Sequence, residues 1–131
     1  MASERRRRQI ARTIQQRLAR VLLYELKDPR ADFLTVTGVE INDDLTLARV
    51  RYTVLDPSAR GRVAAMLEHA HGFLRRQVAA AVRLRTAPQV VFEYDRGAEA
   101  AARIDAILDR VLPREGGREE LREEDQPDDD A

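Results

Sequence analysis

The sequence predicts an α+β fold in a single domain with a three-stranded sheet. Segments in which apolar residues recur every three or four positions are interspersed with shorter segments in which they recur every second position, as in helices and strands respectively. The chain has 131 residues, of which 44% are hydrophobic and 35% are charged, enough for one modest core beneath a strongly charged surface. We therefore expect the order α-β-β-α-kink-α-β-α, without internal repeats.

A long helix is expected from Ser3, which can cap its first turn, to Lys27. Its apolar residues recur at helical spacing and form one face, which consists of Ile10, Ile14, Leu18, Val21, Leu22 and Leu26. The arginines of this segment lie opposite or beside that face, so one side of the helix should pack and the other should be cationic. Pro29 disfavours helical geometry in Asp28 and has no backbone N–H, so the helix should end there.

Two strands follow and should form a hairpin. Residues 33–41 alternate between apolar and polar types until Gly38 shifts the apolar phase, as a β-bulge would. Residues 42–44, Asn-Asp-Asp, supply turn chemistry. In residues 48–54 every second residue is apolar, whereas the intervening residues are arginine or threonine. The hairpin should therefore have one solvated face.

A second helix begins near Val63 and meets Gly72 in the middle of an otherwise continuous helical pattern. A glycine inside a helix costs about 1 kcal/mol relative to alanine, so we interpret Ala70-His71-Gly72 as a kink with a geometric purpose. A packing requirement would explain the glycine equally well. The helix is expected to resume over residues 73–84.

The remainder of the chain is expected to hold a short strand at residues 90–94 and an amphipathic helix that begins beyond Gly97 and ends at Pro113. Residues 113–131 contain three arginines and nine acidic residues, a net charge of −6, with one sizeable apolar residue. Such a segment cannot bury enough surface to offset the entropy of ordering it. We therefore expect a folded domain over residues 1–112 and an acidic, disordered tail over residues 113–131.

The formal net charge of zero conceals a strong asymmetry along the chain. Residues 1–20 carry seven arginines and one acidic residue, a net charge of +6, and residues 21–112 hold thirteen residues of each sign. The expected domain therefore has a net charge of +6 and should favour polyanions.

The composition disfavours enzymes and membrane proteins. The absence of cysteine excludes disulfides, cysteine-ligated metals and a thiol nucleophile. His69 and His71 diverge on a helix, so we expect them to be solvated or capping, and turn chemistry explains Asp43-Asp44 better than a metal site does. The longest apolar runs fall far short of the roughly 20 residues that cross a bilayer, and the N-terminus lacks the apolar run of a signal peptide. We expect a cytoplasmic, monomeric, non-catalytic protein without cofactor, metal or membrane partner.

Two groups of basic residues are candidates for RNA binding. The segment from Arg75 to Arg85 has four arginines and no acidic residue, and it follows the expected kink. Guanidinium groups bind phosphate oxygens bidentately, and a helix N-terminus adds N–H donors for an anion. An ordinary solvated arginine face is the alternative. The arginine run at residues 5–8 is a less specific signal, shared by nucleic-acid arms, lipid binders and frayed termini.

Arg75, Arg76 and Arg83 should share one sector of their helix. Arg75, Arg76 and Arg85 lie on the packed helix-kink-helix and its adjoining loop, so we expect them to matter more for binding than Arg5 to Arg8. Aromatic residues are few and several are assigned to the core, so base stacking should be minor. The residues expected to contact RNA are Arg5, Arg6, Arg8, Arg12, Lys27, Arg30, Arg75, Arg76, Arg83 and Arg85, with Ala70, His71 and Gly72 forming the kink.

Several segments together resemble the ribosome-binding factor A family. They are Lys27-Asp28-Pro29-Arg30, Thr35-Val36-Thr37-Gly38-Val39-Glu40-Ile41, Asp44-Leu45 with Ala48-Arg49-Val50, Ala70-His71-Gly72-Phe73-Leu74-Arg75, Leu84-Arg85-Thr86-Ala87-Pro88 and Val91-Phe92-Glu93-Tyr94-Asp95. Each alone is weak, but jointly they are specific and cover residues 5 to about 111. The four-arginine start and the acidic tail depart from the family's pattern.

The resemblance implies a type II KH-like fold in which an interrupted helix of the form Ala-x-Gly replaces the usual Gly-x-x-Gly loop. It further implies binding to the small (30S) ribosomal subunit and its 16S rRNA, a role in late subunit maturation that includes 16S rRNA 5′-end processing, importance in cold adaptation, and no catalysis. The alternative is a protein–protein adaptor or dimerisation module without RNA binding. Salt separates the two, because phosphate contacts release counterions and an apolar interface does not.

Overall fold

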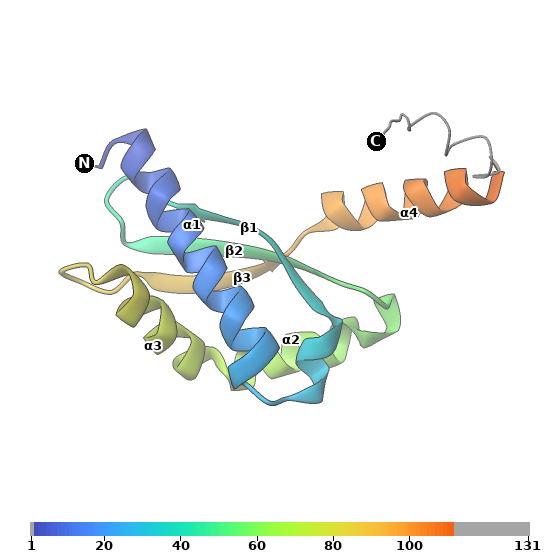
Figure 1. The fold of residues 1–131 in the computed structure, drawn as a ribbon, viewed down its shortest axis with the longest axis horizontal. Helices are drawn as coiled ribbons and strands as arrows, with labels where there is room; N and C mark the ends of the chain where they lie inside the picture. The colour runs from blue at the N-terminus through green and yellow to red at the C-terminus, as the bar shows by residue number, and fades with distance from the viewer. Residues whose placement is uncertain (1, 112–131) are drawn as a thin grey trace. The chain divides into compact units, whose positions relative to one another are not determined.

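The computed structural model describes residues 2–111, which divide between Arg96 and Gly97 into two compact units (Figure 1). The first unit holds the sheet and three helices, and the second holds one helix. The α+β class and the expected order of helices and strands are confirmed. The acidic tail expected at residues 113–131 and the domain boundary expected at residue 112 lie outside the described residues.

The sheet contains the strands β1 (Leu34–Ile41), β2 (Leu47–Val54) and β3 (Gln89–Tyr94) in the order β1-β2-β3. β1 and β2 form the expected antiparallel hairpin, and β3 pairs with β2 in parallel. The register of β1 against β2 shifts between Val36 and Gly38. The bulge expected from the change of apolar phase is therefore confirmed.

Three helices, α1 (Glu4–Arg20), α2 (Arg60–His69) and α3 (His71–Val82), cover one face of the sheet (Figure 1). The helices contribute fully buried side chains to the core, among them Ile14, Leu18, Met66, Leu74 and Val78. On β2 every second residue is buried beneath them, namely Ala48, Val50, Tyr52 and Val54. The opposite face of β2 is solvated, as the alternation in the sequence predicted.

The end of the first helix differs from the prediction. α1 ends at Arg20, and the following residues Val21–Glu25 form one turn of π-helix, hereafter the π-turn, in which the Leu26 N–H donates to the Val21 carbonyl at 2.8 Å. Lys27 then adopts a left-handed conformation, with φ of 57°. A single wider turn shifts the apolar periodicity by one position at the very end of the helix, so the sequence pattern did not reveal it.

The break between α2 and α3 lies at Ala70, which has φ of −91° and ψ of 4°. Gly72, which we expected to make the kink, instead lies in the first turn of α3. A β-carbon at Gly72 would have one close neighbour, the Arg76 side-chain nitrogen Nη1 at 3.4 Å, so the fold does not require glycine there. The break is thus present in the predicted segment, but an alanine makes it.

α3 is shorter than expected, because it ends at Val82 rather than at residue 84. Arg83 caps the helix in the left-handed region, with φ of 50° and ψ of 45°. The expectation that Arg83 shares a helical sector with Arg75 and Arg76 is therefore wrong. The change of backbone conformation at Arg83 turns the chain out of the helix and toward β3.

The second unit holds all but the first residue of α4 (Arg96–Val111), the amphipathic helix expected from the sequence. Its larger apolar residues recur at helical spacing, and Arg103 Nη2 pairs with Glu99 Oε1 at 3.7 Å one turn apart. Within residues 2–111, no helix combines the length and the apolar character that a bilayer crossing demands.

Candidate nucleic-acid interface

The N-terminal group of arginines lies along the solvent side of α1. Ser3 Oγ accepts a hydrogen bond of 3.1 Å from the Arg6 backbone N–H, which confirms the expected N-cap. Arg5, Arg8 and Arg12, with Gln9, line a surface hollow of about 370 Å³. Since these three arginines line one hollow, the group offers several N–H donors to a single anionic segment.

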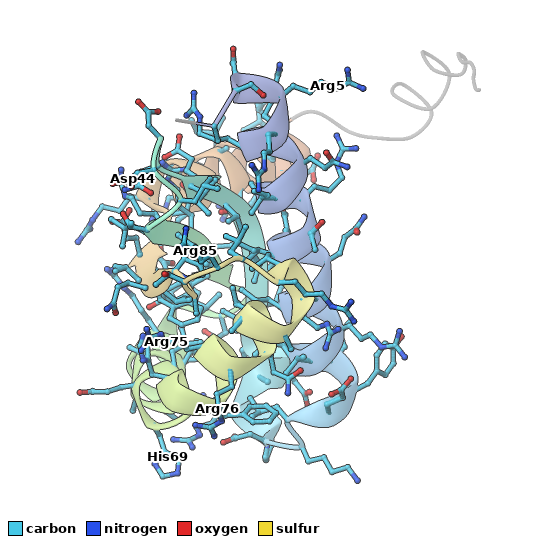
Figure 2. The ribbon with its side chains drawn as sticks, turned by 90° about the vertical axis from the view of Figure 1, so that its left-hand side faces the viewer. Arg5, Asp44, His69, Arg75, Arg76 and Arg85 are labelled. Atoms are coloured by element: carbon cyan, nitrogen blue, oxygen red, sulfur yellow. The ribbon has the colours of Figure 1, made fainter. Side chains whose placement is uncertain are left out.

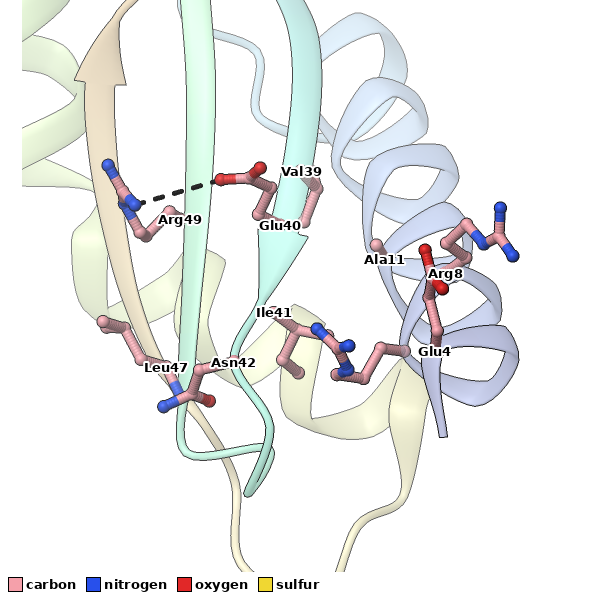
Figure 3. Close-up of a pocket in the computed structure, with 10 residues that line it drawn as sticks. Glu4, Arg8, Ala11, Val39, Glu40, Ile41, Asn42, Leu47 and Arg49 are labelled. Atoms are coloured by element: carbon pink, nitrogen blue, oxygen red, sulfur yellow. Dashed lines mark hydrogen bonds and ion pairs between the residues drawn. The ribbon is translucent and has the colours of Figure 1, made fainter. Parts of the chain in front are cut away.

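A second hollow separates the first half of α1 from the end of the hairpin (Figure 3). It measures about 400 Å³, and Arg8 lines it together with Glu4, Glu40 and Arg49. In Figure 3 the Arg49 side chain lies opposite Glu40, 3.9 Å from its carboxylate. The carboxylates make this hollow less suited to an anion than the hollow that Arg5, Arg8 and Arg12 line.

The turn after the π-turn contains a local ion pair. The Asp28 carboxylate accepts hydrogen bonds from Arg30 Nε at 3.0 Å and Nη2 at 2.7 Å. It also accepts one from the Arg30 backbone N–H at 2.9 Å, which caps a 3-10 helix over Pro29–Phe33. These bonds hold the pKa of Asp28 at about 2, below its usual 3.8. Arg30, expected to contact RNA, is thus engaged within the protein, whereas Lys27 is exposed.

The remaining expected contacts lie on α3 and the segment that follows it. Figure 2 shows Arg75 and Arg85 on the same side of α3, Arg76 near the start of the helix and Arg5 at the far end of α1. Arg83 lies at the end of α3. The structure therefore places the arginines of α1 and those of α3 in separate groups.

The solvated face of the sheet differs from the helical face in its charge pairing. Arg49 Nε and Nη2 each donate to the Glu93 carboxylate at 3.0 Å, and Arg51 Nη2 donates to Glu40 at 2.6 Å. The Arg49 guanidinium lowers the pKa of Glu93, and both partners remain charged at neutral pH. The charges on this face therefore largely cancel.

Nine of the ten expected RNA contacts, all but Arg30, form no salt bridge within residues 2–111. They are Arg5, Arg6, Arg8, Arg12, Lys27, Arg75, Arg76, Arg83 and Arg85. α3 itself contains no acidic residue, and α1 contains only Glu4. The helical side of the first unit therefore carries uncompensated positive charge, which we call the cationic face and define by these nine residues.

His71 has a structural role that the sequence did not indicate. We expected a solvated or capping histidine, but its Nε2 lies 2.7 Å from the Val90 carbonyl of β3, and its ring meets Phe92 edge to face with centroids 6.2 Å apart. The first residue of α3 is thus tied to the neighbouring strand. Its partner is distant in sequence, so neither spacing nor composition could have identified it. His69, by contrast, is exposed.

The arrangement offers positive charge and N–H donors, which suit the binding of a polyanion. Within the described range 2–111, no cluster of three or more histidine and acidic side chains is placed to hold a metal ion.

Comparisons with known proteins agree on one family. The family model described as Ribosome-binding factor A matches residues 6–108. The Ribosome-binding factor A of Geobacter sulfurreducens is 39% identical over 104 residues, which cover 79% of this chain and 88% of the relative. That of Desulfitobacterium hafniense is 42% identical over 109 residues, which cover 82% of this chain and 86% of the relative.

Solved structures give the same answer. A solution structure of a Thermotoga maritima ribosome binding factor A superposes with a TM-score of 0.62 at 34% identity, covering 74% of this chain and 93% of the other. The crystal structure of ribosome-binding factor A from Thermus thermophilus gives a TM-score of 0.58 at 25% identity, covering 69% of this chain and 97% of the other. The matched family model spans most of the chain, and the relatives share well over 30% of the aligned residues. This chain therefore belongs to the ribosome-binding factor A family.

Proposed function

We propose that this protein is a ribosome assembly factor that binds the free small (30S) ribosomal subunit through its 16S rRNA. The observation that carries the proposal is the division of charge in the first unit. Nine cations without salt bridges lie on the cationic face, whereas Arg49 and Arg51 are neutralised by Glu40 and Glu93 on the sheet face. The name of the family, which refers to the ribosome, supports this choice of polyanion.

The chemistry of the cationic face fits an RNA backbone. Guanidinium forks match phosphate oxygens in pairs, and each neutralised phosphate releases condensed counterions into solution. Affinity should therefore fall steeply as salt rises. The N-terminal and α3 groups lie apart, so each would contact a different stretch of the phosphate backbone.

The proposed mechanism is occupancy rather than catalysis. The protein binds one arrangement of an immature subunit more tightly than the mature arrangement, and so stabilises it until late maturation, including 16S rRNA 5′-end processing, is complete. The proposal extends to a cytoplasmic monomer that matters most in the cold. A domain over residues 1–112 carries the binding activity, and residues 113–131 form an acidic disordered tail.

The test measures affinity of the full chain for purified precursor and mature 30S subunits at several salt concentrations. Arg75→Ala/Arg76→Ala should weaken binding to precursor subunits by about tenfold, because two unpaired phosphate ligands are lost. Arg49→Ala/Arg51→Ala is the matched control, since it removes the same formal charge from the neutralised sheet face, and it should change affinity less than about twofold.

Two results would overturn the proposal. Binding that is insensitive to salt would favour the adaptor alternative, in which charged helices meet other proteins. Equal affinity for precursor and mature subunits would contradict the occupancy mechanism. A ligand that binds two states equally well does not shift the equilibrium between them.

A further inference from the structure

Among residues 2–111, Tyr24 has a strongly exposed aromatic side chain. It is 73% exposed, whereas Tyr52 is buried and meets Tyr94 edge to face at 5.5 Å. The Arg60 guanidinium covers the Tyr94 ring at 3.8 Å, and that of Arg62 lies 5.7 Å from the Phe33 ring. The two other phenylalanines pack against the core. Tyr24 therefore presents an open ring that the fold does not use.

The backbone explains why this ring points outward. Tyr24 lies in the π-turn, whose first two residues, Val21 and Leu22, are 0% and 7% exposed. The next residue, Leu23, is 72% exposed, so two large apolar side chains follow each other into solvent. An exposed aromatic ring on such a turn suits a partner that covers it.

Two exposed cations, Arg20 and Lys27, lie within four residues of Tyr24, beside the acidic Glu25. Arg20 is 75% exposed and pairs with Glu25 at 3.8 Å. Lys27 is exposed, makes no salt bridge within the described part of the chain, and is held in a left-handed conformation that few residues with a β-carbon adopt. An unpaired cation close in sequence to an exposed apolar ring complements a nucleotide, in which a flat base adjoins an anionic phosphate.

Tyr24 lies beyond the C-terminal end of α1, away from the hollow that Arg5, Arg8 and Arg12 line and next to the segment that packs against α2. The π-turn contacts the 3-10 helix Pro29–Phe33, which in turn packs against α2. His69, the last residue of α2, is close enough to Asp28 to contribute to the lowering of its pKa. Asp28, which follows Lys27, is thus near the last residue of α2, just before the break.

We propose that the Tyr24 ring, with Leu23 beside it, stacks on an unpaired base of the bound RNA while Lys27 and Arg20 contact the adjoining phosphates. This inference rests on the proposed function and adds a recognition mode to it. Stacking requires a base that is free of its helix, so the contact selects single-stranded RNA over duplex. It replaces the expectation that base stacking is minor.

The experiment compares binding of the full-length protein to a mixed-sequence single-stranded RNA and to the same RNA annealed into a duplex. Tyr24→Ala should weaken binding to the single strand by about five- to fiftyfold and leave binding to the duplex within about twofold. Tyr24→Phe, which keeps the ring, should bind as the wild type does. Leu55→Ala is the control for loss of an exposed apolar side chain, since Leu55 is 82% exposed, and it should change neither affinity.

The possible results are distinguishable. If the wild type binds neither the RNA nor the 30S subunit, the proposed function fails and the inference fails with it. If the wild type binds RNA and Tyr24→Ala binds the single strand equally well, only the stacking inference is overturned. If Tyr24→Ala weakens binding to the 30S subunit but not to the naked single strand, the ring contacts a protein and the inference is also wrong. Because Tyr24 is exposed, thermal unfolding should be the same for all these variants.

Discussion

Arg17 on α1 donates a hydrogen bond of 3.1 Å from its Nη1 to Oε1 of Gln77 on α3. The bond joins the two helices that carry the two separate arginine groups of the cationic face. Arg17 itself is half-buried and is held by this contact rather than presented to a ligand. The hydrogen bond thus holds α1 and α3, and with them the two arginine groups, at a fixed distance. A fixed distance reduces the conformational freedom that the protein loses when both groups contact RNA.

Replacing Gln77 by alanine should therefore weaken subunit binding without removing any charge. We expect a loss of affinity of about threefold and a loss of stability of about 1 kcal/mol, the typical value of one hydrogen bond. Gln16→Ala, at an exposed position on α1, should change neither quantity and serves as the control. Unchanged affinity with reduced stability would show that the spacing of α1 and α3 does not matter for binding.

Lys27 and Arg83 are cations whose backbone is left-handed, and replacing either with glycine should stabilise the fold but weaken RNA binding. A residue with a β-carbon is strained at φ of 57° or 50°, and glycine is not. Lys27→Gly and Arg83→Gly should each raise the free energy of unfolding by about 0.5 kcal/mol, the relief of strain minus the greater entropy of an unfolded glycine. Both should bind RNA less tightly.

The matched variants Lys27→Ala and Arg83→Ala separate these two effects. Alanine removes the cation but keeps the strain, so affinity should fall as it does for glycine with no gain in stability. Chemical denaturation and RNA titration of the four proteins check the prediction. Tighter RNA binding by either glycine variant would show that the cation is not a ligand.

The Asp28–Arg30 pair predicts a specific dependence of stability on pH. Because the pKa of Asp28 is lowered from 3.8 to about 2, the folded state binds the proton more weakly than the unfolded chain does. The contribution of the pair is therefore complete above the unfolded pKa and is lost as the pH falls from 3.8 toward about 2.

Denaturation of the wild type and Asp28→Asn across this range is the measurement. The variant should be less stable at neutral pH, and the difference should shrink through the acid window. Arg30→Gln should behave in the same way, because it removes the other half of the pair. A difference that stays constant down to about pH 2 would contradict the assignment.

Gly72→Ala should stabilise the protein and leave subunit binding unchanged. The residue is helical, and its new methyl group would meet only the flexible end of Arg76 at 3.4 Å. Exchanging glycine for alanine inside a helix gains about 0.5–1 kcal/mol. Thermal unfolding together with subunit affinity tests this, and a drop in affinity would show that glycine has a role in binding that its backbone conformation does not reveal.

Periodicity predicted the parts of the fold that depend on which side of an element faces the core. The spacing of apolar residues predicted which residues of α2 and α3 are buried. It also predicted the alternating burial along β2 and the bulge near Gly38. The cationic character of α1 followed from composition in the same way. These features are local properties of the chain, so a single sequence is enough to show them.

The features that were missed depend on contacts that the sequence does not encode locally. The π-turn and the left-handed Arg83 each change the direction of the backbone at a helix end, where apolar periodicity has already run out. The His71 contact with Val90 spans nineteen positions. Whether Arg30 is free or paired depends on a side-chain rotamer, and no spacing rule distinguishes it from Lys27.

The balanced charges of the sheet face also affect how the protein approaches its partner. Because Arg49 and Arg51 are cancelled by Glu40 and Glu93, the electric field of the first unit emerges mainly from the helical side. Such a field acts over roughly 8 Å in physiological salt, before any surfaces touch. A molecule diffusing near RNA should therefore rotate so that its helical side faces the RNA. Encounter complexes formed through the sheet face should dissociate quickly. Lowering the ionic strength should raise the rate of association as well as the final affinity.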